Sequence, residues 1–289
     1  MKKRINSSNF YPYFYLLPSL ILFSIFLFYP FMKTIRLSLY KTNKLGEPKI
    51  FVGFDNYLEL FQSPSFYNSL KVTFLFVSIV VIISMFIGFT TAYISNSTFI
   101  GVRFFRTAYA LPMAIASTSA AMIFQIMLHP SVGIMNKLFN LNVHWLQDPK
   151  TALYSVAFLT AWLNSGINFL YFSAGLGNID KSIYERASVD GVTPIKQFFK
   201  LTLPALSPII FYTFVVNTIQ AFQSFGQIKI LTEGGPNEST QVIVYSIYRD
   251  AFFNYRFGNA AAQSVILFII IMAVTLLLFL GEKKGVNYS

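Results

Sequence analysis

Five amide side chains stand out because they lie inside long hydrophobic stretches of the chain. Asn217, Gln220 and Gln223 follow one another at intervals of three residues, which places them along one face of a helix. Asn164 and Asn168 lie in an earlier hydrophobic stretch. An amide in an apolar environment is costly, so such groups tend to face a partner helix or an aqueous path. Two interpretations stay open for each amide: contact with a ligand, or hydrogen bonds between helices.

Groups that could do acid–base, nucleophilic or metal chemistry are scarce. The chain has no Cys, which excludes disulfides and thiolate chemistry. Both His residues fall in the stretch 129–150 without a Cys or an acid cluster nearby, a pattern more typical of loop residues than of metal ligands. No paired carboxylates, Ser/Lys pair or His cluster lies within the hydrophobic runs, so nothing supports an intramembrane enzyme. We therefore expect a non-catalytic chain without a metal site.

The segment of residues 180–204 is polar but carries the signals of folded structure. Ser182 followed by Glu185 predicts a capping box that opens a short helix. Gly191 can end that helix, because the residue just past a C-cap often needs a positive φ. Thr193-Pro194 predicts a second start, since proline at the first helical position loses no hydrogen bond. Pro204 is expected to break or bend the second helix. The local prediction is a helix–turn–helix on a membrane surface.

Long charge-free runs surround this segment. Each run is long enough for a helix of about 20 residues to cross a bilayer, and backbone groups in lipid must be hydrogen-bonded within the segment. The predicted fold class is therefore all-α, a polytopic membrane protein with six transmembrane helices. The six spans are expected at approximately 13–35, 71–95, 107–128, 153–177, 205–227 and 260–280.

The charge pattern predicts that both termini are cytoplasmic. The 22 Lys and Arg residues divide evenly between the two sides, so the orientation depends on the basic N-terminus (Lys2, Lys3, Arg4) and on the short acid-free loop that carries Arg103 and Arg106. The net charge of +11 is scattered through loops, which is not the footprint of a nucleic-acid-binding surface. Contact of these basic residues with anionic lipid is expected instead.

The 180–204 segment resembles the EAA loop of ABC-importer permeases. In that pattern Glu-Ala-Ala is followed at fixed spacing by Gly, a branched apolar residue and Leu-Pro. Arg186 replaces the first Ala here, and Leu201 stands where Ile is usual; both keep helix propensity. The resemblance implies that this segment contacts the cytoplasmic ATPase. The residues it assigns to ATPase coupling are Glu185, Arg186, Ala187, Asp190, Gly191, Leu203 and Pro204.

The resemblance also implies an architecture and a set of partners. It implies the type I ABC importer permease fold, with residues 1–68 as tail, first span and outer loop, 69–281 as the transmembrane domain, and 282–289 as a cytoplasmic tail. The implied partners are a second permease in a heterodimer, two ABC ATPase subunits, an extracytoplasmic solute-binding protein and the lipid bilayer. The chain has no phosphate-binding Gly-rich loop, so ATP and Mg are expected on the ATPase. The implied location is the bacterial cytoplasmic membrane.

Further stretches are similar to the first permease subunit of sn-glycerol-3-phosphate importers. They include Phe198-Phe199-Lys200, Val215-Val216-Asn217 with Ala221-Phe222, and Ala260–Val265; the Gly-Gly-Pro turn at 234–236 is typical of the same permeases. The implied solute is sn-glycerol-3-phosphate, and a neutral sugar or oligosaccharide is the alternative. A phosphate ligand favours Arg or Lys at its site, and no span interior has one. The charge would then come from the partner permease or the binding protein.

An ion-gradient-driven secondary transporter is the remaining alternative. Such transporters commonly carry ionisable residues inside their spans and are built from inverted repeats with broken helices. The charge-free interiors of the six predicted spans argue against this class. Uptake that survives collapse of the proton gradient while ATP remains would separate the two classes.

Overall fold

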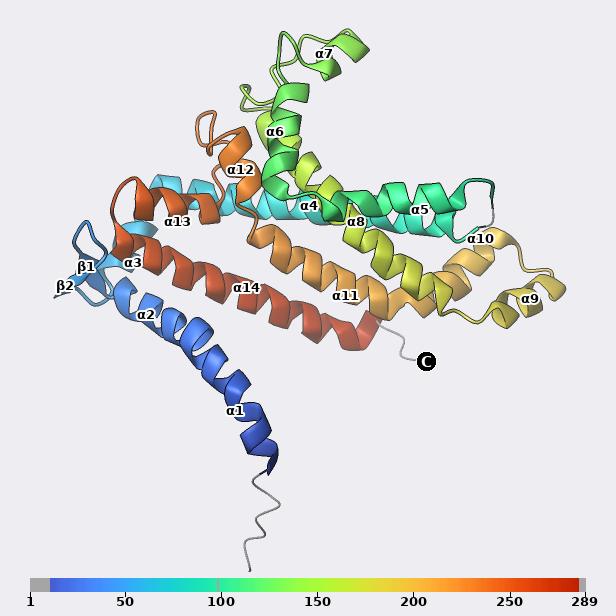
Figure 1. Cartoon of the computed structure of the whole chain (residues 1–289), viewed down its shortest axis with the longest axis horizontal. Coiled ribbons are helices and arrows are strands. Elements are labelled where there is room, and N and C mark those ends of the chain that lie inside the picture. The colour runs from blue at the N-terminus through green and yellow to red at the C-terminus, as the bar shows by residue number, and fades with distance from the viewer. Residues whose placement is uncertain (1–10, 98, 286–289) are drawn as a thin grey trace, which may run out of the picture. The chain divides into compact units, whose positions relative to one another are not determined.

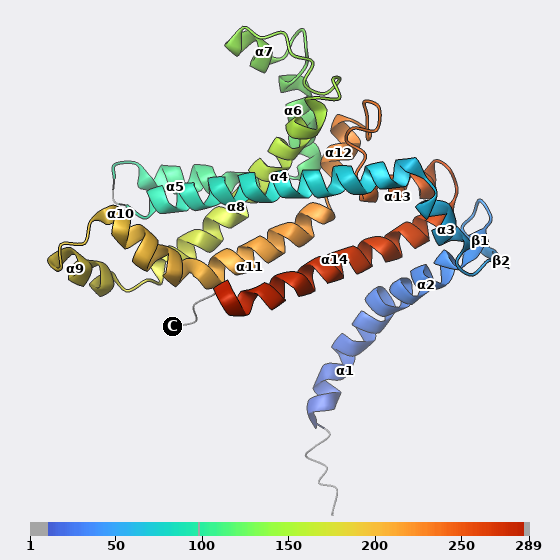
Figure 2. The same ribbon diagram turned by 180° about the vertical axis from the view of Figure 1, so that it is seen from behind.

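The structure, a computed structural model, describes residues 11–97 and 99–285 and is mostly helical (Figures 1 and 2). The basic N-terminus on which the predicted orientation depends lies outside the described residues. The described chain divides into two compact units: unit 1 holds residues 11–62 and 247–267, and unit 2 holds residues 63–246 and 268–285. The domain division expected at residues 68 and 69 stays a prediction.

The first predicted span in unit 1 is one long helical stretch. It consists of α1 (Tyr11–Phe23), a π-helical segment (Ser24–Phe28) and α2 (Tyr29–Ser38). The helical stretch continues past both Pro18 and Pro30. The π-helical segment ends two residues before Pro30, whose ring nitrogen cannot donate to the preceding turn, and a π-turn relieves that mismatch.

The rest of unit 1 is a small hairpin with short helices. β1 (Tyr40–Thr42) pairs antiparallel with β2 (Pro48–Phe51), with Tyr40 opposite Phe51, and α3 (Asp55–Phe61) follows. The C-terminal part of α13 (Ile243–Phe252) and the start of α14 (Phe257–Gly285) complete the unit. A Cβ on Gly258 would collide with the backbone oxygen of Tyr40, so glycine lets the start of α14 approach β1.

The core of unit 2 is made by three long helices, α4 (Pro64–Ser95), α8 (Ala152–Gly177) and α11 (Leu203–Phe222). They lie side by side in both views (Figures 1 and 2). Phe76, Phe172 and Leu206, one from each helix, are fully buried. A Cβ on Gly88 of α4 would collide with the Cβ of Asn168, so α4 and α8 approach unusually closely at this point.

The predicted third span at 107–128 is not one continuous helix, because the helix is broken near its middle. It consists of α5 (Val102–Ala110), a 3₁₀ turn (Leu111–Ala114) and α6 (Ser117–Met127), and the two arms are bent by 103°. Pro112 cannot donate to the preceding turn, and the backbone is extended at Ile115 and Ala116. The break packs on α8, where a Cβ on Gly166 would lie 2.8 Å from the backbone nitrogen of Met113.

Four described helices are long and apolar enough to cross a membrane: Tyr15–Ser38, Pro64–Ser95, Pro194–Phe222 and Phe257–Glu282. The bent pair would make a fifth. The expected fourth span is α8, which contains Asn164 and Asn168 and does not meet the same criterion of apolarity. A mostly helical protein with four to five candidate spans is therefore observed, and the count of six is not confirmed.

Shorter helices occupy the ends of unit 2. The 129–150 stretch contains α7 (Ile134–Phe139), and α12 (Gly226–Leu231) follows α11 after a turn, so the expected fifth span ends at Phe222 rather than at residue 227. At the opposite end, α9 (Lys181–Val189) and α10 (Pro194–Gln197) lie beyond the N-terminal end of α11 (Figure 1).

Candidate functional site

The 180–204 segment opens with a cap that differs from the predicted one. The expected capping box of Ser182 and Glu185 is wrong: Asp180 is the N-cap of α9. Its carboxylate accepts the backbone N–H of Ser182 at 2.9 Å and the Ser182 hydroxyl at 2.8 Å. These bonds lower the pKa of Asp180, the backbone bond most. A carboxylate at the positive end of the helix is a stronger acceptor than a hydroxyl, which explains the earlier start.

Gly191 ends α9 as predicted. Its φ is +74°, a conformation that costs little only for glycine. The Gly191 backbone N–H donates to the Ser188 carbonyl at 3.1 Å, and the Val192 N–H donates to the Ala187 carbonyl at 2.9 Å. These two bonds form a Schellman motif, which satisfies carbonyls at the end of the helix and fixes the direction of the following chain.

The second helix begins where it was predicted, with Thr193 in an extended conformation and Pro194 at the first helical position. Pro204 does not end this helix, contrary to one of the two expected outcomes. A π-helical segment, Phe198–Thr202, joins α10 to α11 just before the proline. The π-turn accommodates the missing proline donor, so Pro194–Phe222 is one continuous helical stretch.

Side-chain hydrogen bonds fix α9 against the second helix. The hydroxyls of Tyr184 and Thr202 are 2.9 Å apart. The Gln197 amide donates to the Ser188 hydroxyl at 3.1 Å and to the Val192 carbonyl at 3.0 Å. These hydrogen bonds hold the 180–204 segment together as a helix pair next to the N-terminal end of α11.

The outer face of this helix pair combines charge with apolar surface. Val189, Ile195 and Phe199 are 88%, 72% and 62% exposed. The charged residues of the predicted coupling set, Glu185, Arg186 and Asp190, are also exposed. Large exposed apolar groups rimmed by charges are typical of a protein–protein contact. Leu203 and Pro204 lie at the start of α11 and are only partly exposed.

Aromatic contacts connect the helix pair to the core of unit 2. The ring of Phe198 packs edge-to-face against Tyr93 and Phe89 of α4, with ring centroids 5.3 Å and 5.9 Å away. Phe89 in turn packs edge-to-face on Phe172 of α8 at 5.4 Å. The 180–204 segment is therefore in packing contact with α4 and, through Phe89, with α8. It is also joined to α11 by a continuous helix.

Two of the five predicted pathway amides form a buried pair. Asn168 and Asn217 are 0% and 1% exposed. The Asn217 amide donates to the Asn168 side-chain oxygen at 2.7 Å, and the Asn168 amide donates back at 3.1 Å. Asn217 also accepts from the Ser84 hydroxyl at 3.1 Å and donates to the Thr213 carbonyl at 2.7 Å. In this arrangement the pair joins α8, α11 and α4 by hydrogen bonds.

The other three predicted amides are not brought into this cluster. Asn164 is half-buried on α8, whereas Gln220 and Gln223 are exposed. Gln223 lies at the C-terminal end of α11 rather than inside a span. The role of all five residues in a substrate pathway stays a prediction.

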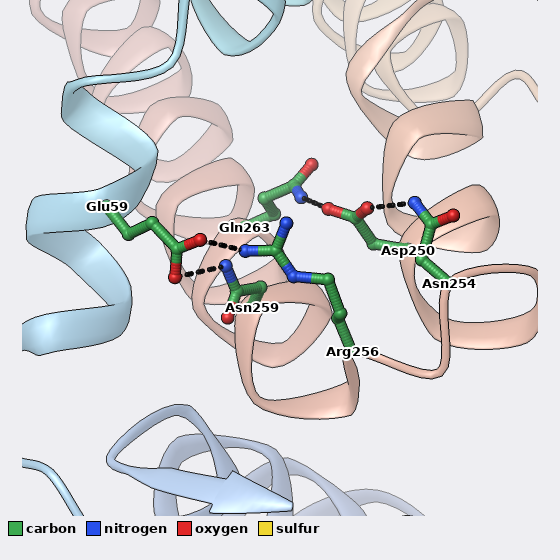
Figure 3. A network of polar contacts seen from close by, with 6 residues as sticks. All are labelled: Glu59, Asp250, Asn254, Arg256, Asn259 and Gln263. Carbon is green, nitrogen blue, oxygen red and sulfur yellow. Dashed lines mark hydrogen bonds and ion pairs between the residues drawn. The ribbon is translucent and has the colours of Figure 1, made fainter. Parts of the chain in front are cut away.

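The opening of α14 belongs to a polar network that the sequence did not reveal (Figure 3). Glu59 of α3 forms an ion pair with Arg256 and accepts the Asn259 amide at 3.1 Å. Asp250 accepts from the amides of Gln263 at 2.6 Å and Asn254 at 2.8 Å. Gln263 belongs to the stretch Ala260–Val265 named in the sequence, but the carboxylate partners of Asn259 and Gln263 could not be inferred from spacing.

Burial and hydrogen bonding act in opposite directions on Glu59. Burial raises its pKa, while the bonds from Asn259 and Arg256 and the charges of Arg256 and Lys41 lower it. The lowering effects prevail, so Glu59 is held ionised. Among the described residues, no group of three or more His, Asp or Glu could hold a metal ion.

The comparison with protein families matches most of the chain. Residues 98–282 match the family described as binding-protein-dependent transport system inner membrane component. The matched range contains α5 to α13, including the 180–204 segment, and most of α14.

The chain is similar over its whole length to curated bacterial permeases. It is 35% identical over 293 residues to the sn-glycerol-3-phosphate transport system permease protein UgpA of Agrobacterium fabrum and 34% identical to that of Brucella suis, each covering 100% of both chains. It is 33% identical to the protein of that name from Pectobacterium atrosepticum, covering 98% of this chain and 97% of the relative.

Solved structures share the fold. One is a bacterial ABC transporter involved in the import of the acidic polysaccharide alginate, with a TM-score of 0.84, 24% identity and coverage of 96% and 97% of the two chains. Another is the bacterial alginate transporter in complex with an alginate pentasaccharide-bound periplasmic protein, with a TM-score of 0.85, 23% identity and coverage of 98% and 100%. On the family match and the full-length relatives, the chain belongs to the binding-protein-dependent transport system inner membrane components.

Proposed function

We propose that this chain is a permease subunit of an ATP-driven importer and forms half of the translocation pathway for sn-glycerol-3-phosphate. The observation that carries the proposal is the similarity, along the entire chain, to permeases named for transport of that solute. The geometry of the 180–204 segment supports it, because a rigid helix pair with exposed apolar residues is suited to contact another subunit.

The proposed assembly contains a second permease, two ABC ATPase subunits and a solute-binding protein on the outer side. A solved relative was captured with a periplasmic protein that carries its solute, which supports a binding-protein partner here. ATP and Mg would bind to the ATPases. The proposed topology has six spans, with the bent α5–α6 pair as the third and α8 as the fourth, and both termini in the cytoplasm.

The proposed coupling step is mechanical. Closure of the ATPase dimer on ATP displaces the helix pair α9–α10. The continuous helix Pro194–Phe222 carries that displacement into α11, and Phe198 carries it to α4 and, through Phe89, to α8. Rearrangement of these three helices turns the pathway from inward-facing to outward-facing.

The test is ATP-dependent uptake by the reconstituted complex with a substitution at Gly191. Gly191→Val forces a β-branched residue into a positive φ, which redirects the chain after α9. We expect assembly and membrane insertion to persist while uptake per ATP hydrolysed falls by about tenfold or more, since strain of about 1–3 kcal/mol would displace the loop. Gly281→Val is the control, because that glycine has no positive φ and open space around its Cβ position. Normal coupling in the Gly191 variant would contradict the coupling role.

A further inference from the structure

A largely apolar cavity with a few polar side chains, about 660 Å³ in volume, lies in unit 2 between the end of α4, the second half of α5 and α8. Its walls come from the C-terminal turn of α4, from α5 with the following 3₁₀ turn, and from the last half of α8. The volume is within the range of ligand sites for small molecules. The polar side chains in its lining are Ser95, Asn96, Arg106, Thr107 and Ser173.

Arg106 gives this cavity a positive charge. Its guanidinium donates from Nη2 to the Ser95 carbonyl at 2.7 Å and from Nε at 3.3 Å, so one edge of the group caps the end of α4. A guanidinium has five N–H donors, which leaves donors beyond those two bonds. Within the described part of the chain, no carboxylate forms an ion pair with Arg106.

Ser173 is a second unusual group in the cavity wall. Its hydroxyl oxygen is buried and has no hydrogen-bond partner among the described residues. Buried hydroxyls nearly always have a partner, and rotation about χ1 would turn this one from its solvent-inaccessible position toward a ligand in the cavity. The remaining wall, including Phe169, Leu170 and Met113, is apolar. The guanidinium can bind a phosphate, and the polar side chains of Asn96 and Thr107 in the wall can bind the hydroxyls of a small phosphate ester.

The cavity lies next to the helix pair of the 180–204 segment. Gly177 in its wall is three residues before Asp180, the cap of α9. Tyr93, on the last turns of α4, contacts Phe198. In the proposed topology this is the cytoplasmic end of the pathway.

We propose that this cavity is an exit-side site for the phosphate of sn-glycerol-3-phosphate, with Arg106 binding the phosphate and Ser173 contributing a hydrogen bond. The inference rests on the proposed function for its solute and orientation. It changes the expectation that the phosphate's charged partner must come from other subunits. The search for a charged residue inside the predicted spans did not include Arg106, because this residue lies at the edge of a predicted loop.

The first measurement is binding of labelled sn-glycerol-3-phosphate to the purified full complex in detergent, without ATP or the binding protein. Arg106→Gln should weaken binding about tenfold, the effect of losing one charge-assisted hydrogen bond. Arg103→Gln is the matched control: it removes the same charge one turn earlier on α5, from an exposed residue that does not line the cavity. Equal affinity of the two variants would overturn the site.

A second pair of variants keeps the cap of α4 intact, in case loss of Arg106 prevents assembly. Ser173→Asp places a carboxylate in the cavity wall and should abolish binding by repulsion and by pairing with Arg106. Ser173→Asn, of similar size but neutral, should retain binding within about threefold, since the amide still donates. Unchanged binding in the Ser173→Asp variant would overturn the proposal.

Uptake into liposomes then separates the possible sources of the phosphate. In liposomes of phosphatidylcholine alone, with no anionic lipid, Arg106→Gln should still reduce the uptake rate relative to Arg103→Gln. A defect that appears only when phosphatidylglycerol is present would assign the site to a lipid headgroup and overturn the solute assignment. Absence of ATP-dependent uptake by the unsubstituted complex would instead contradict the proposed function itself.

Discussion

At the scale of single residues, the Asn168–Asn217 pair predicts an asymmetric response to substitution. Asn217→Leu would leave Asn168 without any of its side-chain hydrogen bonds within the described chain. Asn168→Leu would leave Asn217 with its bonds to Ser84 and Thr213. An unsatisfied buried amide costs about 1–3 kcal/mol, so Asn217→Leu should lower the melting temperature of the purified complex more than Asn168→Leu.

The double variant is the control for this prediction. Replacing both amides by Leu removes the unsatisfied group, so the double variant should melt above Asn217→Leu alone. A different result would favour the pathway interpretation: full thermal stability in Asn168→Leu together with lost uptake would mean that the amide acts on the solute and not on helix packing.

The environment of Glu59 predicts that the stability of the protein decreases in acid. Its pKa is lowered in the folded state from an ordinary value of 4.5, so folding favours the ionised form. The stabilising contribution of ionised Glu59 is therefore fully present above about pH 4.5. It is lost as the pH falls through the lower pKa of the folded state. At neutral pH the Glu59→Gln complex should have a lower melting temperature than the unsubstituted complex. In acid the two melting temperatures should approach each other.

The control for Glu59 is Asp55→Asn, which removes an exposed carboxylate from the first turn of the same helix, α3. We expect it to leave the difference in melting temperature between neutral and acid pH unchanged. A Glu59→Gln complex that keeps the full acid sensitivity of the unsubstituted one would contradict the role given to the ion pair with Arg256.

Local chemistry was predictable from the sequence at this scale, but long-range partners were not. Gly191 and Pro194 act through backbone preferences that a few neighbouring residues determine. The cap was misassigned because Ser182 and Asp180 both offer acceptors, and only the observed backbone shows which one caps the helix. The pairs Asn168–Asn217 and Glu59–Arg256 join residues 49 and 197 positions apart, a separation at which spacing carries no information.

At the scale of elements, the helix pair α9–α10 should transmit movement through Phe198. Phe198→Ala removes the ring that packs on Phe89 and Tyr93 of α4. The ATPase should still bind and hydrolyse ATP, while solute transported per ATP should fall several-fold. Phe104→Ala, a change of the same side chain at an 81% exposed position on α5, should leave this ratio unchanged. Equal ratios in the two variants would show that coupling does not use this contact.

The composition of the sequence predicted the bounds of a helix only where that helix is uninterrupted. α8 matches its predicted range within one residue because an apolar run defines it, whereas α4 ends at Ser95 as predicted but begins at Pro64 rather than at residue 71. The broken third stretch was predicted as a single span, since the extended residues Ile115 and Ala116, where the helix breaks, have no strong sequence signal. Pro204 was expected to break or bend a helix that a π-turn instead keeps continuous.

At the scale of the whole molecule, the proposed topology predicts which exposed sites are reached from each side of the membrane. The chain has no Cys, so single cysteines can be introduced without a background. Leu45→Cys, at an 82% exposed hairpin position, should react with a membrane-impermeant thiol reagent from outside intact cells. Ile100→Cys, fully exposed in the short loop before α5, should react only after the cytoplasmic side is opened. The reverse pattern would contradict the proposed orientation.

The most direct test of the central claim is uptake of labelled sn-glycerol-3-phosphate by proteoliposomes that contain the complete complex, with the loaded binding protein outside. Uptake should require Mg-ATP inside, should survive collapse of the proton gradient, and should not be competed by a neutral oligosaccharide. Uptake of the oligosaccharide in place of sn-glycerol-3-phosphate would contradict the solute. Uptake without ATP would contradict the importer itself.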